Sequence, residues 1–121
     1  MTSKYRGIYL RSIKDPEGFW SEISNDIFWY KKPKKILNSD NPPFYKWFQD
    51  GTTNTCYNAV DFHIKKGNGK KIAIIYDSPI TNSQKKITYK QLKDQVSIFA
   101  GALTNQGIKK GDRVIIYMPM I

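Results

Sequence analysis

The sequence predicts a mixed α/β fold that is an incomplete piece of a larger domain. Two short apolar runs, at residues 72–77 and 113–118, have the composition of β-strands. The second run, "RVIIYM", shows almost no polar alternation, which is typical of a strand buried on both faces of a parallel sheet. A predicted helix lies between them, and this order favours a right-handed β-α-β unit. Such a sheet needs more strands than this chain offers, so we expect further residues of a longer protein to complete it.

The first helix is predicted to begin in "KDPEGFWSEI". Asp15 suits the N-cap because its carboxylate accepts a hydrogen bond from an amide of the first turn, and Pro16 suits the first helical position. Apolar residues then recur at helical spacing, namely Phe19, Trp20, Ile23 and Ile27. This stripe predicts a helix face that packs on a core.

Residues 29–48, "WYKKPKKILNSDNPPFYKWF", are predicted to be irregular because Pro33, Pro42 and Pro43 interrupt any helix. Aromatic rings are dense here, and two interpretations remain open. Interleaved with lysines, the rings suit stacking on nucleic acid bases. Alternatively, they attach an extended segment to a larger body, which is the interpretation we favour.

A second helix is predicted in "TNTCYNAVDFHIKKGNGKK", with Thr53 or Asn54 as its cap and Gly67 at its end. His63 has no second histidine, cysteine pair or carboxylate cluster near it in sequence, so it is expected to be a packing residue and not a metal ligand. Cys56 lies seven residues before His63, but nothing orients the histidine as a base for the thiol. One face of this helix is expected to hold Cys56, Tyr57, Val60 and Ile64.

A β-hairpin and a third helix are predicted next. The strand Ile72–Asp77 is followed by a loop and a short second strand at Ile87–Tyr89. Thr88 and Gln91 have the spacing of a capping box, and Gly107 suits the end of the helix that follows. The face expected to be apolar holds Leu92, Val96, Phe99, Ala100 and Leu103.

The net charge of +10 comes from 20 basic and 10 acidic residues, and only three of the basic residues are arginine. Because direct reading of bases relies on arginine, we interpret this charge mainly as a lysine-rich surface. The single cysteine, Cys56, excludes a disulfide within the chain and fits a reducing compartment. The apolar run Val114–Met118 is too short to span a bilayer, and no secretory signal is present. Residues 1–14 contain no acid and weakly resemble a mitochondrial presequence.

The joint spacing of residues in the second half of the chain resembles the opening of the N-terminal domain of acyl-adenylate-forming enzymes. The matching residues are Thr88, Tyr89, Leu92, Ala100, Leu103, Gly107, Ile108, Gly111, Asp112, Val114 and Pro119. Earlier, "DPEGFW", "NPPFYKWFQDG" and "TNTCYNAVDFH" resemble the N-terminal extension of short-chain acyl-CoA synthetases of the acetyl- and propionyl-CoA type. The stretches "CYNAVD" and "YDSPIT" look closer to the propionate-type branch.

The resemblance runs from about Tyr5 to Ile121 and implies two parts, an N-terminal extension at residues 1–69 and the truncated start of the AMP-binding domain at 70–121. It also implies that the basic N-terminus is part of the body and not a removable leader. Phe62 stands where the family usually has arginine, so an ion pair or hydrogen bond made from this helix is in doubt.

The resemblance implies a ligase that uses ATP, Mg²⁺ and coenzyme A to activate a short-chain acid, propionate preferred over acetate, through an acyl-AMP intermediate. It places the phosphate loop, the ribose-binding carboxylate and the late lysine downstream of Ile121. We therefore expect no catalytic, cofactor-binding or metal residue in this chain, which alone would be structural and inactive. Asp112 is expected to be a turn acid, and Tyr117 and Met118 are expected to be core residues of a strand.

The implied partner is the remainder of the same polypeptide, in the cytoplasm or alternatively the mitochondrial matrix, with neither nucleic acid nor membrane as a partner. A rival hypothesis is a small basic module that binds RNA or acidic partners through residues 28–48. A third is a truncated paralogue that caps the sheet of another protein. Phosphate binding would show a steep dependence on salt, which separates the rival from the ligase hypothesis.

Overall fold

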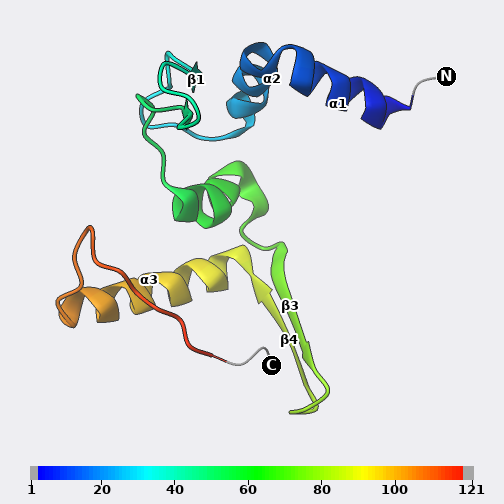
Figure 1. Ribbon diagram of the computed structural model, residues 1–121. Coiled ribbons are helices and arrows are strands. Elements are labelled where there is room, and N and C mark those ends of the chain that lie inside the picture. Colours follow the sequence, from blue (N-terminus) through cyan, green and yellow to red (C-terminus); the bar gives the residue numbers. More distant parts are fainter. Residues whose placement is uncertain (1–2, 119–121) are drawn as a thin grey trace. The chain divides into compact units, whose positions relative to one another are not determined.

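The computed structural model describes residues 3–118 (Figure 1). The chain divides into two compact units, Met1–Asn58 and Ala59–Ile121, which are taken in turn below. Helices are combined with small antiparallel strand pairs. This content confirms the mixed α/β class predicted from the sequence.

Two consecutive helices open the first unit, α1 at Lys4–Lys14 and α2 at Pro16–Ile23. Asp15 joins them, because its amide donates to the Arg11 carbonyl at 2.9 Å and its carboxylate accepts from the Gly18 amide at 3.0 Å. The predicted cap at Asp15 is therefore confirmed. The sequence analysis did not predict α1, although Ser3 caps it by accepting a hydrogen bond from the Arg6 amide.

The end of α2 comes earlier than the apolar stripe predicted. A 3₁₀ turn, η1 at Ser24–Asp26, follows Ile23, and Ile27 is extended, so the prediction that Ile27 continues the helix face is wrong. Serine, asparagine and aspartate compete for backbone hydrogen bonds and weaken a helix. Here the Ser24 hydroxyl donates to the Ser21 carbonyl at 2.8 Å.

The rest of the first unit is a long irregular loop, as its prolines predicted. Its only regular pairing within the described residues is a two-residue antiparallel ladder between β1, Leu37–Asn38, and β2, Lys46–Trp47. A bridge between Lys31 and Thr52 closes the base of the loop. The Pro42–Pro43 peptide bond is cis.

The second predicted helix is present and contains two π-helical stretches, η2 at Tyr57–Asp61 and η3 at Ile64–Asn68. Asn54 caps it, since its side-chain oxygen accepts a hydrogen bond from the Tyr57 amide at 2.8 Å. Gly67, where the sequence predicted the helix to end, has φ of +85°, a conformation that favours glycine and interrupts the helix, whereas the last stretch is assigned one residue further, to Asn68.

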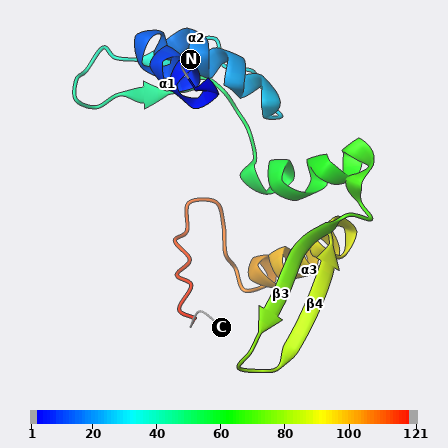
Figure 2. The ribbon, with the colours of Figure 1, turned by 90° about the vertical axis from the view of Figure 1, so that its right-hand side faces the viewer.

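The predicted hairpin is also confirmed, with β3 at Ile72–Ser78 and β4 at Ser83–Thr88 paired antiparallel (Figure 2). The second strand differs from the predicted Ile87–Tyr89, because it starts at Ser83 and ends at Thr88, and Tyr89 already belongs to the next helix. Residues assigned to the loop pair as well, for example Lys86 with Ile75.

Helix α3, Tyr89–Asn105, starts directly after β4. The predicted capping box is present: the Gln91 amide donates to the Thr88 hydroxyl at 3.3 Å, and the Thr88 amide donates to the Gln91 side chain at 2.9 Å. Three residues of the predicted apolar face are partly buried, namely Leu92, Val96 and Leu103.

The predicted last strand is not formed. Residues 112–118 pair with no strand in the part of the chain that the structure describes, so the expected β-α-β unit is incomplete. Tyr117 and Met118, expected to be core residues, are 99% and 75% exposed. A strand needs a neighbouring strand for its backbone hydrogen bonds. In the described part of the chain β3 pairs with β4 alone, so residues 112–118 have no such neighbour. Pro119 lies outside the described residues.

Burial is sparse throughout residues 3–118. Phe19, Pro33 and Val60 are the buried apolar side chains there, and many large apolar residues are exposed. The two units are therefore stabilised by caps, loop hydrogen bonds and ring contacts more than by a continuous core.

Candidate functional site

Cys56 and His63 are the residues that the sequence analysis weighed as a reactive pair. Cys56 is exposed, and the ring of His63 packs on that of Tyr89 with centroids 4.9 Å apart. This contact agrees with the expected packing role of His63. Among residues 3–118, no group of three or more histidine, cysteine or acidic side chains lies close enough to hold a metal ion.

Asp112 is a turn acid, as predicted. Its carboxylate accepts a hydrogen bond from the Lys109 amide at 2.7 Å, and its own amide donates to the Lys109 carbonyl at 3.1 Å. These two bonds close the turn that follows α3.

Phe62 lies under a cation of its own helix. The Lys66 ammonium is 4.2 Å from the centre of the Phe62 ring, a cation–π geometry. Beside it, Asp61 pairs with Lys93 of α3 at 3.7 Å. The helix therefore makes an ion pair from Asp61, the residue directly before Phe62.

The first unit carries a shallow apolar hollow of about 360 Å³ lined by Trp20, Trp47 and Phe48. Trp20 and Trp47 meet edge to face with centroids 6.3 Å apart, and Trp29 extends the ring cluster beside Phe48 at 5.5 Å. The Trp29 indole N–H donates to the Ser24 carbonyl at 2.9 Å. The lining contains no ionisable group, so the hollow is suited to apolar contact and not to acid–base chemistry.

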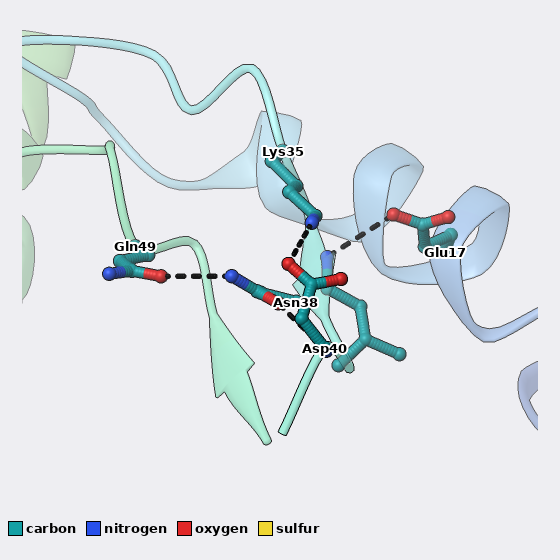
Figure 3. Close-up of polar contacts among 6 residues, drawn as sticks. Glu17, Lys35, Asn38, Asp40 and Gln49 are labelled. Atoms are coloured by element: carbon teal, nitrogen blue, oxygen red, sulfur yellow. Dashed lines mark hydrogen bonds and ion pairs between the residues drawn. The ribbon is translucent and has the colours of Figure 1, made fainter. Parts of the chain in front are cut away.

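Polar contacts fix the loop that presents this hollow (Figure 3). The Glu17 carboxylate of α2 accepts a hydrogen bond from the Leu37 amide of β1 at 3.3 Å. Nearby, the Lys35 ammonium pairs with Asp40 at 3.2 Å, and the Asn38 amide group donates to Gln49 at 3.4 Å. The Glu17 bond therefore joins β1 to α2, and the other two contacts lie within the loop.

Asp50 anchors the other side of the loop. Its carboxylate accepts hydrogen bonds from the amides of Lys34, at 3.0 Å, and of Lys35, at 3.4 Å. The Lys34 bond is the main cause of a pKa of Asp50 that lies below its ordinary value.

Asn58 has a positioning role that sequence reasoning missed. Its side chain accepts from the Phe28 amide at 2.7 Å and donates to the Phe28 carbonyl at 3.0 Å, which pairs both backbone groups of that residue. The rings of Phe28, Tyr30 and Tyr57 pack together beside it. A pairing across thirty residues leaves no local sequence signal.

Hydroxyl groups gather at the turn of the β3–β4 hairpin. The Thr81 and Ser83 hydroxyls are 2.7 Å apart, and the Thr81 amide donates to the buried Ser78 hydroxyl at 3.4 Å. Hydrogen bonding with Ser78, and then with Thr81, lowers the pKa of Tyr76. The cluster closes the turn.

No helix within residues 3–118 has the length and apolar character needed to cross a membrane.

Comparisons with known proteins match the chain in two adjacent parts. Residues 5–59 match the family model described as "Acetyl-coenzyme A synthetase N-terminus", and residues 62–121 match the model described as "AMP-binding enzyme". The two matches cover both compact units.

Individual relatives align over nearly the whole chain. A protein of Homo sapiens named "Acyl-CoA synthetase short-chain family member 3, mitochondrial" is 52% identical over 98% of this chain. Proteins named "Acetyl-coenzyme A synthetase" from Streptomyces coelicolor and Paraburkholderia phymatum are 49% and 46% identical, over 93% and 96% of it. The chain spans only 17% or 18% of the length of these relatives.

Proposed function

We propose a function on the premise that this chain belongs to the AMP-forming short-chain acyl-CoA synthetase family, of which it covers the N-terminal region. The proposed activity of the whole protein is to join a short-chain carboxylic acid to coenzyme A. The observation that carries it is the succession of the two family matches in one chain, at 5–59 and 62–121.

The proposed reaction has two steps and uses ATP, Mg²⁺ and coenzyme A. First, a carboxylate oxygen attacks the α-phosphorus of ATP and the bond to pyrophosphate breaks, which forms the acyl-adenylate. Then the thiol of coenzyme A, losing its proton, attacks the acyl carbonyl and AMP leaves. Such a reaction needs cations and positioned donors around the phosphates.

We assign this chain a structural part in that reaction and no catalytic, cofactor-binding or metal residue. Its supporting observations are the packing of His63 on Tyr89, the turn hydrogen bond of Asp112 and an apolar hollow without ionisable lining. Its partner is the remainder of the same polypeptide, onto which residues 1–69 would wrap as an extension while residues 70–121 begin the AMP-binding domain. A boundary near residue 60, within the helix that holds η2 and η3, is the alternative, because the first family match ends at residue 59 and the second begins at residue 62.

Propionate is the proposed preferred acid, with acetate accepted less well. In support, the stretches "CYNAVD" and "YDSPIT" resemble the propionate-type branch of the family. The cytoplasm is the proposed compartment, and the printed name of the human relative makes the mitochondrial matrix the alternative.

The test compares the isolated 121-residue chain with a full-length protein that carries it. We expect the full-length protein to release AMP and pyrophosphate from ATP with propionate, coenzyme A and Mg²⁺. The isolated chain should release none and should melt with poor cooperativity or self-associate, because its apolar segments are unpaired. A difference of one methylene predicts a kcat/KM for propionate about tenfold above that for acetate. A full-length protein that forms no AMP with any short-chain acid would contradict the proposal.

A further inference from the structure

The stretch "GNGK" at residues 67–70 leads from the second helix towards β3 and has no part in the proposed function. Gly67 interrupts the helix with φ of +85°, and the last helical stretch ends at Asn68. Helix ends fray, so the backbone of Asn68 opens more readily than that of a residue within α3. Asn68 and Gly69 are both partly exposed. Solvent therefore reaches the peptide bond that joins them.

Asn68 differs from the other asparagines of the described chain in combining two properties. Its side chain makes no hydrogen bond within residues 3–118, whereas several other asparagine side chains do, namely Asn25, Asn38, Asn54 and Asn58. Its neighbour is Gly69, whose amide nitrogen has no side chain beside it. The remaining asparagines are followed by a larger residue or by proline, which lacks an amide hydrogen, namely Asn41, Asn82 and Asn105.

The surroundings of Asn68 in the sequence are cationic. Exposed lysines precede and follow it within three residues, namely Lys65, Lys66, Lys70 and Lys71. No acid lies between the first and the last of them. Nearby cations favour the anionic form of a group, so they favour a deprotonated Gly69 amide and the oxyanion that forms when this amide attacks a carbonyl.

We propose that Asn68–Gly69 is a modification site at which Asn68 is deamidated by its own backbone. The Gly69 nitrogen loses its proton and attacks the side-chain carbon Cγ of Asn68. The bond from Cγ to the side-chain nitrogen breaks, ammonia leaves with that proton, and a succinimide ring remains. Water then adds to either ring carbonyl and opens the ring to aspartate or isoaspartate. The reaction consumes only water, so it is independent of the proposed ligase activity.

The modification acts on the contacts that join this loop to α3. The Lys71 amide donates to the Asn68 carbonyl at 2.9 Å, and the Lys90 amide donates to the Gly69 carbonyl at 3.0 Å. In isoaspartate the main chain runs through Cβ and Cγ, so the former main-chain carbonyl becomes a carboxylate beside the chain. The turn bond of Lys71 is thereby lost, and the Gly69 carbonyl is displaced from Lys90.

The experiment incubates the full-length protein at neutral pH and follows the peptide 61–76, which the protease Asp-N releases by cutting before Asp61 and Asp77. Deamidation gives this peptide the mass of a hydroxyl in place of an amino group. Asp-N cuts before a new aspartate at position 68 and not before isoaspartate, so the two products are distinguished.

Asn68 should lose its amide at least about tenfold faster than Asn105, which Asp-N releases in the peptide 94–111 and which precedes glutamine. The rate at Asn68 should rise about tenfold for each pH unit above neutral, because the deprotonated amide is the attacking species. Equal rates at the two asparagines, or a rate that does not change with pH, would overturn the proposal.

Gly69→Ala tests the attacking residue. Its Cβ crowds the nitrogen and restricts the backbone, so it should slow the loss of the amide at least about tenfold. The variant keeps the fold, since Gly69 has φ of −55° and the added Cβ meets Ile64 Cγ2 at 3.6 Å, an ordinary contact. Gly101→Ala is the matched control, with no atom within 4 Å of its Cβ, and should leave the rate within about twofold. Deamidation of Gly69→Ala at the wild-type rate would overturn the mechanism.

Two further measurements test the part played by the fold. The native protein should deamidate at most about tenfold more slowly than the urea-unfolded chain, because the helix end opens locally. Stronger protection would overturn the site in the native protein. In the isoaspartate form the Lys71 amide should exchange with solvent at least about tenfold faster than in Asn68→Asp, which has the same charge on an ordinary backbone. Equal exchange in the two forms would overturn the effect on the turn.

Discussion

The two compact units are built in different ways. In the first, up to Asn58, a long loop is fixed by side chains that bond to distant backbone groups, such as Asn58 to Phe28 and Asp50 to Lys34. In the second, from Ala59, most of the order comes from a hairpin and a capped helix whose hydrogen bonds are local. The first unit therefore depends on individual side chains, whereas the second depends on regular backbone pairing.

This difference predicts that single substitutions harm the first unit more than the second. A regular ladder shares its stability among many equivalent bonds, and the loss of one side chain leaves the others in place. In a loop held by a few long-range contacts, no equivalent bond replaces a lost one, because each contact closes a large loop by itself.

The largest effect is expected for Phe19→Ala. Phe19 is only 9% exposed, and its ring packs edge to face on Trp20 with centroids 5.2 Å apart. Its loss should cost the first unit about 3 kcal/mol of unfolding free energy and leave the second unit unchanged. Amide hydrogen exchange measured separately over the two units checks this result.

Phe44→Ala is the matched control, because it removes the same side chain from a position that is 71% exposed. It should change the stability of the first unit by less than about 0.5 kcal/mol. Equal effects of the two substitutions would contradict the assignment of Phe19 to the core of this unit.

Asn58→Ala is expected to come next. It removes the two hydrogen bonds that this side chain makes to the Phe28 backbone, at a cost of about 2 kcal/mol, although the Thr53 hydroxyl still donates to the Phe28 carbonyl at 2.7 Å. Faster exchange of the amide of Phe28 and of its neighbours would show the loss. Asn105→Ala, at the end of α3, removes an asparagine without such contacts in the described structure and should leave the first unit unaffected.

Thr88→Ala should have a smaller effect, confined to the second unit. It removes the hydroxyl that caps α3, which predicts a loss of about 1 kcal/mol and fraying of the first turn near Gln91. Thr88→Ser keeps the hydroxyl and should restore most of the stability, as followed by helical circular dichroism. If serine failed to rescue, the capping hydrogen bond would not be the cause.

The smallest effect is a pH dependence of the loop in the first unit. The pKa of Asp50 is lowered in the folded chain, so its contribution is present above the unfolded value of about 4 and is lost as the pH falls through the folded value. We expect the amides of Lys34 and Lys35 to exchange faster, relative to intrinsic rates, as the pH falls below about 4. Asp50→Asn should flatten this dependence, and an unchanged profile would assign it to another carboxylate.

The sequence determined the elements that rest on neighbouring residues. The cap at Asp15 before Pro16 and the Thr88–Gln91 capping box are local signals, and both were predicted correctly. Gly67 interrupts its helix within one residue of the assigned end. The resemblance to short-chain acyl-CoA synthetases, drawn from spacing along the chain, is confirmed by the family matches. That no catalytic or ligand residue lies in this chain stays a prediction.

Only the tertiary structure decided the features that depend on distant partners. The Asn58 contact with Phe28, the hollow between Trp20 and Trp47, and the exposure of the apolar side chains of α1 have no local signature. The structure of residues 113–118 also depends on a distant partner. Their composition predicts a strand, but a strand exists only where another strand pairs with it. Caps and turns are satisfied within a few residues, whereas ring clusters and ladders require residues that the chain brings together only by folding.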